Sequence, residues 1–411
     1  MPKRSSLSVA LIGTKFMGRA HSNAWRQAPH FFDLPADIRM AVICGRDPAS
    51  TRRAAKALGW ENSSTDWRAI IADPQIDIID ICTPNDSHSE IAIVAANAGK
   101  AILCEKPLAR TVAEAERMAA TVKRANMVCH NYRRVPAIAL AKQMIENGEL
   151  GQRIYHFRAR YAQDWIANED FPMVWRLKKE IAGSGALGDI GAHIIDLARY
   201  LVGEIASVFA VSETFVKRRP TRNRPHLNPL LRGEEDAPHA GKEAGSPRLV
   251  ATGLRAARGA GRTFGRVDAD DAVSVIGRFR NGAILNLEAT RFAYGRKNAL
   301  SFEINGSRGS LCFDLEDLNR LRFYDASDPE HARGFRDIIV TEPSHPYAAH
   351  WWPPGHLLGY EHSFVHTIAD FVRAVISGKR AQPDFADGLR TQRVLDAIIR
   401  SARGGGKAGR L

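Results

Sequence analysis

The sequence has no hydrophobic run that approaches the roughly 20 apolar residues of a membrane-spanning helix. The opening residues, MPKRSSLSVALIG, place basic residues before an apolar run. That run is shorter than the core of a signal peptide and suits a first β-strand better. We therefore expect a cytoplasmic protein without a membrane segment.

Cysteine is also scarce, and its spacing argues against two kinds of site. The five cysteines are scattered along the chain and form no C-x-x-C pair, and most lie in apolar, strand-like stretches. This pattern is typical of buried thiols in a reduced compartment rather than of disulfides or zinc ligands. The sequence therefore predicts no bound metal ion.

Acidic residues are too few to balance the basic ones, and the excess is concentrated in one segment. The net charge is +13, and residues 217–266 hold twelve Lys and Arg against four Asp and Glu. This segment is rich in Gly, Pro and Arg and has little hydrophobic periodicity, which favours a long mobile insertion. It has no zinc-ligand spacing and no aromatic-rich RNA-binding signature, so we expect no nucleic-acid partner.

The length of 411 residues exceeds what one hydrophobic core usually organises, so two domains are expected. In residues 1–130, apolar strands alternate with helical stretches; the strands lie at 8–13, 39–45, 76–83 and 100–105. This alternation predicts an α/β fold with a Rossmann-type parallel sheet that helices cover on both faces. Residues 131–400 contain strand-like stretches joined by turns such as Asn281-Gly282, and residues 401–411 resemble a flexible tail.

The turn after the first strand, G-T-K-F-M-G (13–18), has Lys15 where the dinucleotide motif G-x-G-x-x-G has its middle glycine. Gly13 allows the tight turn, and Gly18 lets the helix approach the strand. The position between a strand and a helix is the context that the motif requires. We therefore expect a phosphate against the amides of Lys15, Phe16 and Met17, at the helix N-terminus.

The end of the second strand bears on the choice of nicotinamide cofactor. An acid there binds the ribose 2′-hydroxyl of NAD, whereas a small residue with an arginine accommodates the 2′-phosphate of NADP. This chain has Gly45, Arg46 and Asp47 in succession. Both readings therefore stay open at this point.

Two more motifs put polar residues at the carboxyl edge of the predicted sheet, where ligands of such folds bind. Thr83-Pro84-Asn85 follows one apolar strand, and Glu105-Lys106 follows the next, just before a proline. A surface lysine is the ordinary interpretation. Beside a cofactor, however, Lys106 is well placed to donate to a substrate hydroxyl or to act on its proton.

The stretch S-G-A-L-G-D-I-G-A-H-I-I-D (184–196) places Asp189 and His193 four residues apart, on one face of a predicted helix. The helix dipole favours an acid in the first turn, and the preceding glycines leave room for a ligand to approach. An imidazole titrates near neutrality and suits a general base. A capping Asp and a hydrogen-bonded core His form the structural alternative.

Five motifs together resemble the glucose–fructose oxidoreductase / inositol dehydrogenase (Gfo/Idh/MocA) family: G-T-K-F-M-G-R-A-H-S, T-P-N-x-x-H, E-K-P, N-Y-R-R and G-x-x-x-D-I-G-A-H-x-x-D. The likeness covers residues 7–215 and 267–400. It implies a Rossmann-type domain and a second, substrate-binding α/β domain, whose open, mostly antiparallel sheet forms the interfaces of a homodimer or homotetramer. It also implies oxidation of a sugar or cyclitol hydroxyl with a nicotinamide cofactor, NAD being favoured over NADP.

The resemblance also implies roles for individual residues. His193 would be the base, Lys106 the electrostatic activator and proton-relay partner, and Asp189 the residue that orients the substrate or His193. For the cofactor site it adds Gly45, Arg46, Asp47, Thr83, Pro84, Asn85, His88, Glu105 and Lys106 to the first turn. For the sugar site it implies Tyr132, Arg133, Gln163, Asp164, Trp165, Trp175, Arg176, Asp189 and His193, with Arg291 and Tyr294 as further candidates.

Within the family, Q-D-W and the segment W-W-P-P-G-H…Y-E-H are most similar to levoglucosan dehydrogenase-type enzymes. Those enzymes oxidise the 3-hydroxyl of a sugar whose anomeric carbon is blocked. Inositol 2-dehydrogenase is the second candidate, and a non-catalytic cofactor-binding scaffold or regulator is the alternative class. The aromatic segment 345–356 is expected either to cover a pocket or to fill an interface.

Overall fold

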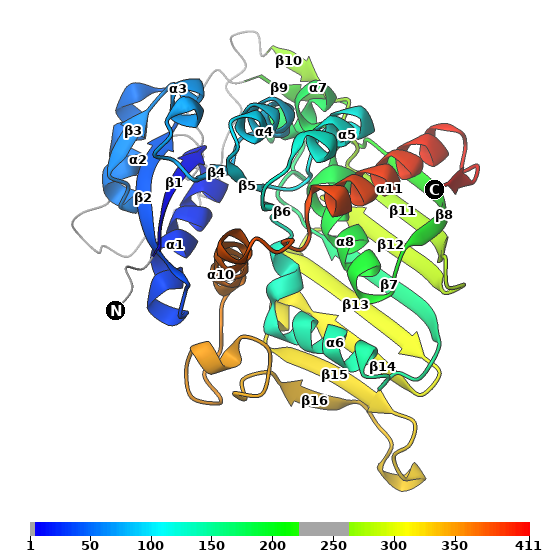
Figure 1. Cartoon of the computed structure of the whole chain (residues 1–411). Helices are drawn as coiled ribbons and strands as arrows, with labels where there is room; N and C mark the ends of the chain where they lie inside the picture. The colour runs from blue at the N-terminus through cyan, green and yellow to red at the C-terminus, as the bar shows by residue number, and fades with distance from the viewer. Residues whose placement is uncertain (1–4, 222–262) are drawn as a thin grey trace, which may run out of the picture.

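The computed structural model describes residues 5–221 and 263–411 (Figure 1). Most of the basic segment predicted at 217–266 therefore lies outside the described residues. Its two described ends pair as the short antiparallel strands β9 (Arg218–Pro220) and β10 (Phe264–Arg266).

The N-terminal sheet has six parallel strands in the order β3-β2-β1-β4-β5-β6. Its strands are β1 (Ser5–Ile12), β2 (Ala36–Cys44), β3 (Asn62–Ser64), β4 (Ile78–Ile81), β5 (Ala101–Cys104) and β6 (Asn126–Val128). The chain runs outward from β1 in one direction and then from β4 in the other. Ligands of such folds bind at this switch point, at the carboxyl ends of the strands. The predicted parallel sheet is confirmed.

Helices cover both faces of this sheet because the strands bury side chains on both sides. The helices of this half are α1 (Phe16–Phe31), α2 (Pro48–Leu58), α3 (Trp67–Ala72), α4 (His88–Asn97) and α5 (Val112–Thr121). Val9 and Leu11 of β1 pack with α1, whereas Ala10 and Ile12 pack with α3, α4 and α5. Successive side chains of β1 thus point to opposite faces of the sheet and enter two separate apolar layers.

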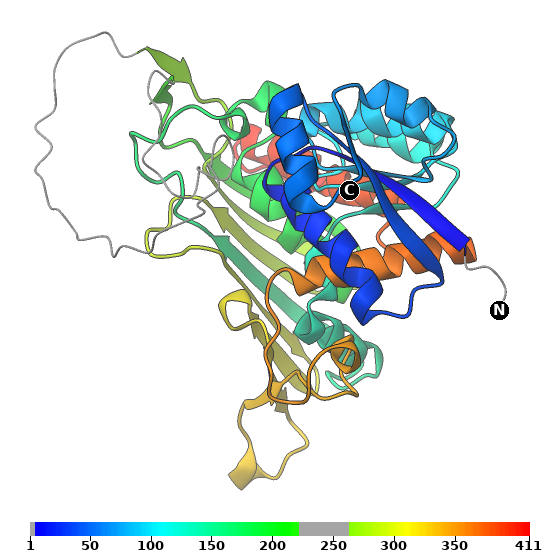
Figure 2. The same cartoon turned by 90° about the vertical axis from the view of Figure 1, so that its left-hand side faces the viewer.

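Near its end, the chain returns to the N-terminal sheet. The sequence did not indicate this return. Helix α10 (His362–Ser377) lies beside α1 (Figures 1 and 2). Its Phe364 and Ile368 share an apolar cluster with Trp25. The sheet therefore gets one of its covering helices from a segment that begins 331 residues after the end of α1, the helix beside it.

The second sheet has nine strands in the order β16-β15-β14-β13-β7-β12-β11-β8-β17. All neighbours are antiparallel except β7 and β12, which are parallel. The strands are β7 (Ile154–Ala162), β8 (Ile205–Glu213), β11 (Ala272–Phe279), β12 (Ile284–Thr290), β13 (Ala299–Gly306), β14 (Gly309–Asp314), β15 (Arg320–Asp325), β16 (Arg336–Ile339) and β17 (Gly409–Arg410). The mostly antiparallel sheet is as predicted.

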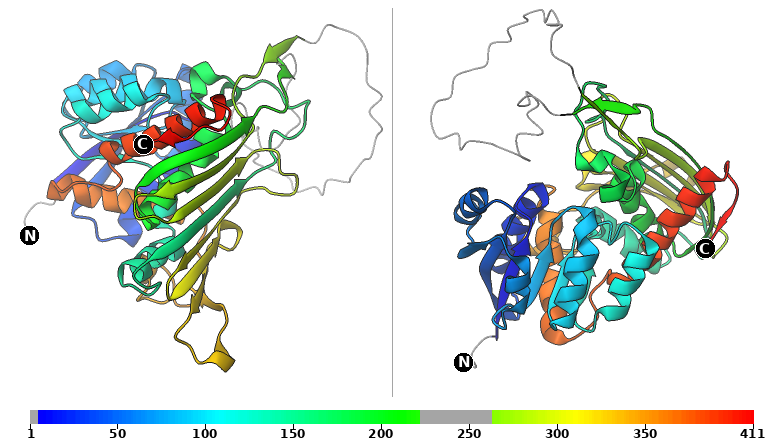
Figure 3. Two further views of the ribbon diagram at one scale, coloured as in Figure 1. Left: turned by 90° about the vertical axis from the view of Figure 1, so that its right-hand side faces the viewer. Right: turned by 90° about the horizontal axis from the view of Figure 1, so that it is seen from above.

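Among the residues that the structure describes, helices lie on only one face of this sheet and leave the other face open (Figure 3, left). The covering helices are α6 (Pro136–Glu146), α8 (Ala192–Leu201) and α11 (Phe385–Arg403). Strand β11 accordingly alternates buried and exposed residues. The predicted turn at Asn281-Gly282 joins β11 to β12, and its Gly282 has a φ of 90°.

Short helical turns connect these elements. They are η1 (Asn85–Ser87), η2 (Asn131–Arg134), η3 (Trp175–Leu177), α7 (Lys179–Ala182), η4 (Leu187–Gly191), η5 (Leu315–Asp317), η6 (Glu330–Ala332) and η7 (Ala348–His350). The predicted tail at 401–411 includes the end of α11 and strand β17, which pairs with β8. Across the described residues, none of the helices combines the length and apolar character needed to cross a bilayer.

Candidate active site

The first glycine turn forms a cradle that fits a dinucleotide phosphate. Gly13 has a φ of 120°, and a Cβ there would lie 2.4 Å from the carbonyl oxygen of Cys82. A Cβ on Gly18 would lie 2.0 Å from the carbonyl oxygen of Gly13. Helix α1 begins at Phe16 without a side-chain cap, so its first amides are available to an anion. The middle-position Lys15 does not disturb this geometry.

The residues after β2 are suited to the ribose of NAD. A Cβ on Gly45 would lie 2.4 Å from Thr51 Oγ1, so a larger residue there would require the neighbouring side chains to move. Asp47 is exposed and caps α2, where it accepts a 2.7 Å hydrogen bond from the Ser50 amide. That backbone hydrogen bond lowers the pKa of Asp47. An ionised carboxylate can accept from ribose hydroxyls but repels a 2′-phosphate, and the exposed neighbour Arg46 is the opposing influence.

Thr83, Pro84 and Asn85 lie at the carboxyl edge of β4, as predicted for a ligand-binding edge. The Asn85 side chain is buried, and its amide donates to the carbonyl of Ala182 in α7 at 2.9 Å. Asn85 therefore links the two halves of the molecule at this edge, and a direct contact between its side chain and the cofactor stays a prediction.

His88 also holds this edge together. Its ring nitrogens lie 2.9 Å from the Thr83 carbonyl oxygen and 3.1 Å from that of Pro107. Burial lowers the pKa of His88, so the neutral ring donates to one of these carbonyls. His88 thereby connects the loop after β4 to the loop that carries Lys106, and a direct role in cofactor binding stays a prediction.

Lys106 and Asp189 meet between the two halves of the chain. Lys106 follows β5, and its Nζ donates to the main-chain oxygen of Asp189 at 2.5 Å and lies 3.5 Å from Asp189 Oδ1. The two side chains are 14% and 24% exposed, so both retain access to a ligand. Two residues 83 positions apart in sequence thus share one site, as the motifs predicted.

The charge on Asp189 follows from its surroundings. Burial alone would raise the pKa of this carboxyl, but the cations Lys106, Arg176 and Arg291 outweigh burial and lower it. Arg291 is fully buried, and its Nη1 lies 3.9 Å from Asp189 Oδ2. Asp189 is therefore an anion held among cations, able to accept hydrogen bonds from hydroxyl groups.

Asp189 lies in a π-helical turn, η4, rather than in the predicted α-helix. The Asp270 carboxylate fixes the start of this turn by accepting from the amides of Gly185 and Leu187 at 2.6 and 2.8 Å. A Cβ on Gly185 would lie 1.8 Å from the Asp270 carbonyl oxygen. Gly185 therefore leaves room for the loop before β11 rather than for a ligand, which corrects the expectation for this glycine.

His193, in α8, is a buried neutral imidazole. Its Nδ1 has no hydrogen-bond partner among the described residues, and its ring centroid lies 4.5 Å from that of Tyr132. Burial, Lys106 and His130, in that order, hold the pKa of His193 well below its usual range. Asp189 pairs with Lys106, so the expected hydrogen bond from His193 to Asp189 is not formed within the described part of the chain.

Beside His193, a chain of hydrogen bonds extends from Tyr132 toward the second sheet. The hydroxyls of Tyr132 and Tyr161 are 2.8 Å apart, and Tyr161 donates to Asn298 Oδ1 at 2.7 Å. Gln163 donates to the same oxygen at 2.8 Å and accepts from Trp165 Nε1 at 2.9 Å. The predicted residues Tyr132, Gln163 and Trp165 are thus brought together.

Other predicted sugar-site residues make contacts elsewhere. The Arg133 guanidinium donates to Asp196 at 2.8 and 2.6 Å and to Asp387 at 2.8 Å, deep in the second half. Asp164 accepts from Lys297 Nζ at 2.7 Å. Sugar contacts by Arg133 and Asp164 stay predictions.

Trp175 and Arg176 lie together on η3, where the guanidinium carbon is 4.5 Å from the indole centroid, and Arg176 acts electrostatically on Asp189. Tyr294 is 76% exposed, on the loop after β12.

The aromatic segment 345–356 packs within the chain, since Trp351 lies against Phe31 with ring centroids 4.2 Å apart. This segment therefore fills an interface between α1 and α10.

The motif analysis left several neighbours of the site unassigned. Tyr161 and Asn298 complete the hydrogen-bond chain, and Tyr360 lies 6.3 Å from Tyr132 between ring centroids. A buried triad of His21, Asp80 and Glu105 adjoins Lys106. An acid in an otherwise apolar strand, IDIIDIC, was the available signal, because an acid is rarely buried without a partner.

Comparison with known proteins agrees with this geometry. Residues 7–132 match the family described as "Oxidoreductase family, NAD-binding Rossmann fold", and residues 138–312 match the GFO/IDH/MocA C-terminal domain. Levoglucosan dehydrogenase of Pseudarthrobacter phenanthrenivorans is 46% identical over 97% of this chain and 96% of its own length. Inositol 2-dehydrogenase of Rhizobium meliloti is 24% identical over 96% of this chain and 97% of its own.

Solved structures give the same result. An oxidoreductase domain protein from Kribbella flavida is 48% identical, with a TM-score of 0.86 over 99% of both chains. Levoglucosan dehydrogenase in complex with NADH and levoglucosan is 43% identical, with a TM-score of 0.86 over 99% of both chains. The phosphate cradle, the lysine–aspartate pair and these matches over nearly the full length lead to one conclusion: the chain belongs to the GFO/IDH/MocA family of NAD-dependent oxidoreductases.

Proposed function

We propose that this enzyme oxidises the 3-hydroxyl of a sugar whose anomeric carbon is blocked, such as levoglucosan, to a ketone. The observation that carries the proposal is the meeting of Lys106, Asp189 and a neutral His193 at the carboxyl edge of the Rossmann sheet. The full-length similarity to levoglucosan dehydrogenase supports the choice of substrate.

In the proposed mechanism, His193 takes the hydroxyl proton at Nε2, because Nδ1 is buried. Its lowered pKa keeps the ring deprotonated and ready to accept. The Lys106 ammonium stabilises the developing negative charge on the substrate oxygen. The ionised Asp189 holds Lys106 and accepts a hydrogen bond from a second hydroxyl of the sugar.

NAD supplies the hydride acceptor when it is bound. The turn from Gly13 to Gly18 would hold its pyrophosphate, and Asp47 would bind its adenosine ribose. Tyr132, Gln163 and Trp165 would line the sugar site, since aromatic faces suit ring C–H groups and amides suit hydroxyls.

The test is a panel of sugars and cyclitols with NAD, followed by the absorbance of NADH. We expect the highest kcat/KM for levoglucosan, and kcat lowered by roughly 100-fold or more in Lys106→Ala and His193→Ala while NAD still binds. A clear preference for inositols would favour the second candidate, inositol 2-dehydrogenase. An absence of turnover with every compound would favour a non-catalytic scaffold.

Two further parts of the proposal concern the whole protein. We propose a homodimer or homotetramer formed through the open face of the nine-stranded sheet, on which apolar side chains are exposed. We also propose a cytoplasmic location, because the five cysteines are free thiols and NAD is the cofactor.

A further inference from the structure

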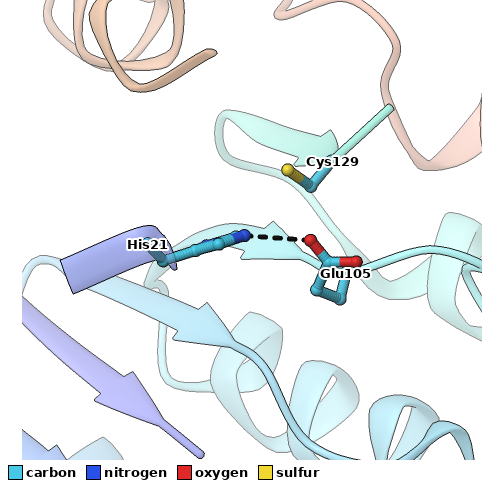
Figure 4. A group of neighbouring side chains, drawn as sticks. All are labelled: His21, Glu105 and Cys129. Atoms are coloured by element: carbon cyan, nitrogen blue, oxygen red, sulfur yellow. Dashed lines mark hydrogen bonds and ion pairs between the residues drawn. The ribbon is translucent and has the colours of Figure 1, made fainter. Parts of the chain in front are cut away.

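A buried histidine, His21, joins two carboxylates next to Lys106. Figure 4 shows its pairing with one of them, Glu105. His21 lies on α1 and is 1% exposed. Its Nδ1 is 3.0 Å from both carboxylate oxygens of Asp80, and its Nε2 is 2.9 Å from Glu105 Oε1. Both ring nitrogens face carboxylate oxygens, which as anions only accept hydrogen bonds, so the geometry favours a ring that carries a proton on each nitrogen. The ring is therefore an imidazolium between two anions.

The surroundings stabilise this arrangement of charges. Burial alone would lower the pKa of His21, but Asp80, with smaller contributions from Cys82 and Cys129, raises it well above the ordinary value. Asp80 is fully buried on β4, and its Oδ2 also accepts from Trp25 Nε1 at 2.7 Å.

Glu105 completes the triad and is ionised as well. Burial would raise the pKa of this carboxyl, but hydrogen bonding and charge from His21, and the charge of Lys106, lower it. Other described groups that interact with Glu105 include Tyr360, Cys104 and His88. Burial raises the pKa of Tyr360 and of Cys104 well above the usual values and lowers the pKa of His88, so all three are neutral.

Glu105 connects the triad to Lys106 in the active site. Its Oε2 accepts from the main-chain amide of Lys106 at 3.2 Å, and Lys106 Nζ reaches Asp189. His21 lies in the helix whose first turn forms the phosphate cradle. The triad thus connects the cofactor helix to the residue that holds the lysine.

We propose that His21 is a positioning residue: as an imidazolium it holds the ionised Glu105, and Glu105 holds Lys106 in place for catalysis. This inference rests on the catalytic role proposed for Lys106. Without the charge of His21, two carboxylates would share one buried space, and one of them would take up a proton. When Glu105 is the carboxyl that takes up the proton, it becomes neutral below its raised pKa. Lys106 then loses its anionic neighbour.

The same donors are close enough to hold a metal ion, since His21, Glu105 and Cys129 cluster together. Burial, followed by the charge of Glu105, raises the pKa of the Cys129 thiol to about 12. A metal would need the thiolate and a ring nitrogen without its proton. The hydrogen-bonded triad is therefore the state that the geometry favours.

The experiment compares His21→Gln with His366→Gln, using levoglucosan and NAD. His366 is a matched control because it is equally buried and bonded at both ring nitrogens, to Trp351 Nε1 at 2.7 Å and to the Arg134 carbonyl oxygen at 2.8 Å. We expect His21→Gln to lower kcat about tenfold and to move the acid limb of kcat/KM upward by about one pH unit or more. His366→Gln should lower the melting temperature and leave that limb in place.

A Lys106→Ala background separates positioning from general damage. If His21 acts through Lys106, His21→Gln should change kcat by no more than about twofold in that background. Two results would overturn the proposal. One is a tenfold fall in kcat when His21→Gln is added to Lys106→Ala. The other is an acid limb of kcat/KM that does not move in His21→Gln alone. If His21→Gln does not fold, Glu105→Gln takes its place in the same two backgrounds. We then expect kcat to fall about tenfold at every pH, because the side chain at position 105 no longer titrates, and to change by no more than about twofold in the Lys106→Ala background.

Two controls separate the positioning role of His21 from the catalytic role of Lys106 and from metal binding. If Lys106→Ala keeps normal turnover, the catalytic assignment fails before the positioning question arises. Metal analysis of the purified enzyme should find no stoichiometric zinc or iron, and Cys129→Ser should keep the wild-type pH profile. A bound metal that is lost in both His21→Gln and Cys129→Ser would overturn the ion triad.

Discussion

At the residue scale, burial and neighbouring charge give each side chain of the site a different protonation state. Asp189 is an anion because three cations outweigh its burial, and His193 is neutral because burial and the cation Lys106 both disfavour its charged form. A base and an electrostatic activator can therefore operate side by side at neutral pH.

The titration of His193 predicts the pH dependence of the reaction. Only the neutral ring can accept the hydroxyl proton, so activity rises as pH passes upward through its pKa. Because that pKa is lowered from 6.5, the acid limb of kcat/KM should lie below pH 6.5. The measurement is kcat/KM for sugar oxidation between pH 4 and 9. An acid limb above pH 7 in the wild-type enzyme would contradict the assignment of His193 as the base.

The candidate site was predictable from the sequence where motifs carry it. Lys106 lies between a strand end and a proline, and Asp189 and His193 follow glycines; these are local signals. Tyr161 and Asn298 were not predictable, because they meet Tyr132 only through the pairing of β7 with β13. In the sequence, Arg133 looks no different from an arginine that binds a ligand. Its partners Asp196 and Asp387, however, come from two distant helices.

At the element scale, the π-helical turn η4 aims Asp189 at Lys106, and Gly185 allows that turn to lie against Asp270. We expect Gly185→Ala to displace η4 and lower kcat/KM roughly 100-fold. The control is Gly188→Ala, whose added Cβ would meet only the movable Ser184 hydroxyl, at 2.4 Å. Steady-state kinetics with NAD decides the matter, and equal effects of the two variants would contradict this role of η4.

Helix α11 is anchored to the second half through Asp387. Its carboxylate, 6% exposed, contacts Arg133 at 2.8 Å and Arg199 at 2.7 Å. Burial would raise the pKa of Asp387, but the two arginines lower it strongly. The folded pKa is thus below the unfolded one, so this stabilisation is present above about pH 4 and is lost as pH falls further.

We therefore expect Asp387→Asn to lower the free energy of unfolding by about 3 kcal/mol at pH 7. The effect should shrink as pH falls below about 4. The matched control is Arg393→Ala, which removes a pair between the same helix and Glu116 that is 54% and 49% exposed and should cost less than about 1 kcal/mol. Urea unfolding followed by circular dichroism measures both, and a larger loss in the control would refute the argument.

At the scale of the whole molecule, the sequence predicted each half better than the way in which they join. The β-α-β alternation and the Asn-Gly turn indicated a parallel and a mostly antiparallel sheet because both signals are local. The return of α10 to the first sheet was not predictable. An amphipathic helix shows that it will bury one face, but its pattern does not say against which partner.

The open face of the nine-stranded sheet leads to the last prediction, on oligomeric state. Phe209 on β8 and Ile276 on β11 are direct cross-strand partners, and they are 47% and 60% exposed. A paired apolar surface on a sheet face without covering helices favours burial against a second copy. We expect Ile276→Glu to convert the oligomer into a 45.3 kDa monomer, as measured by light scattering after size exclusion.

Leu357→Glu provides the matched control, because Leu357 is 65% exposed on the loop before α10, outside the strands of the sheet. It should leave the assembly intact, since a charge there enters no buried surface. The substitution in β11 is expected to disrupt the assembly because each subunit would bring an unpaired carboxylate into the same apolar contact. A wild-type monomer, or an Ile276→Glu protein with unchanged mass, would mean that this face has another use.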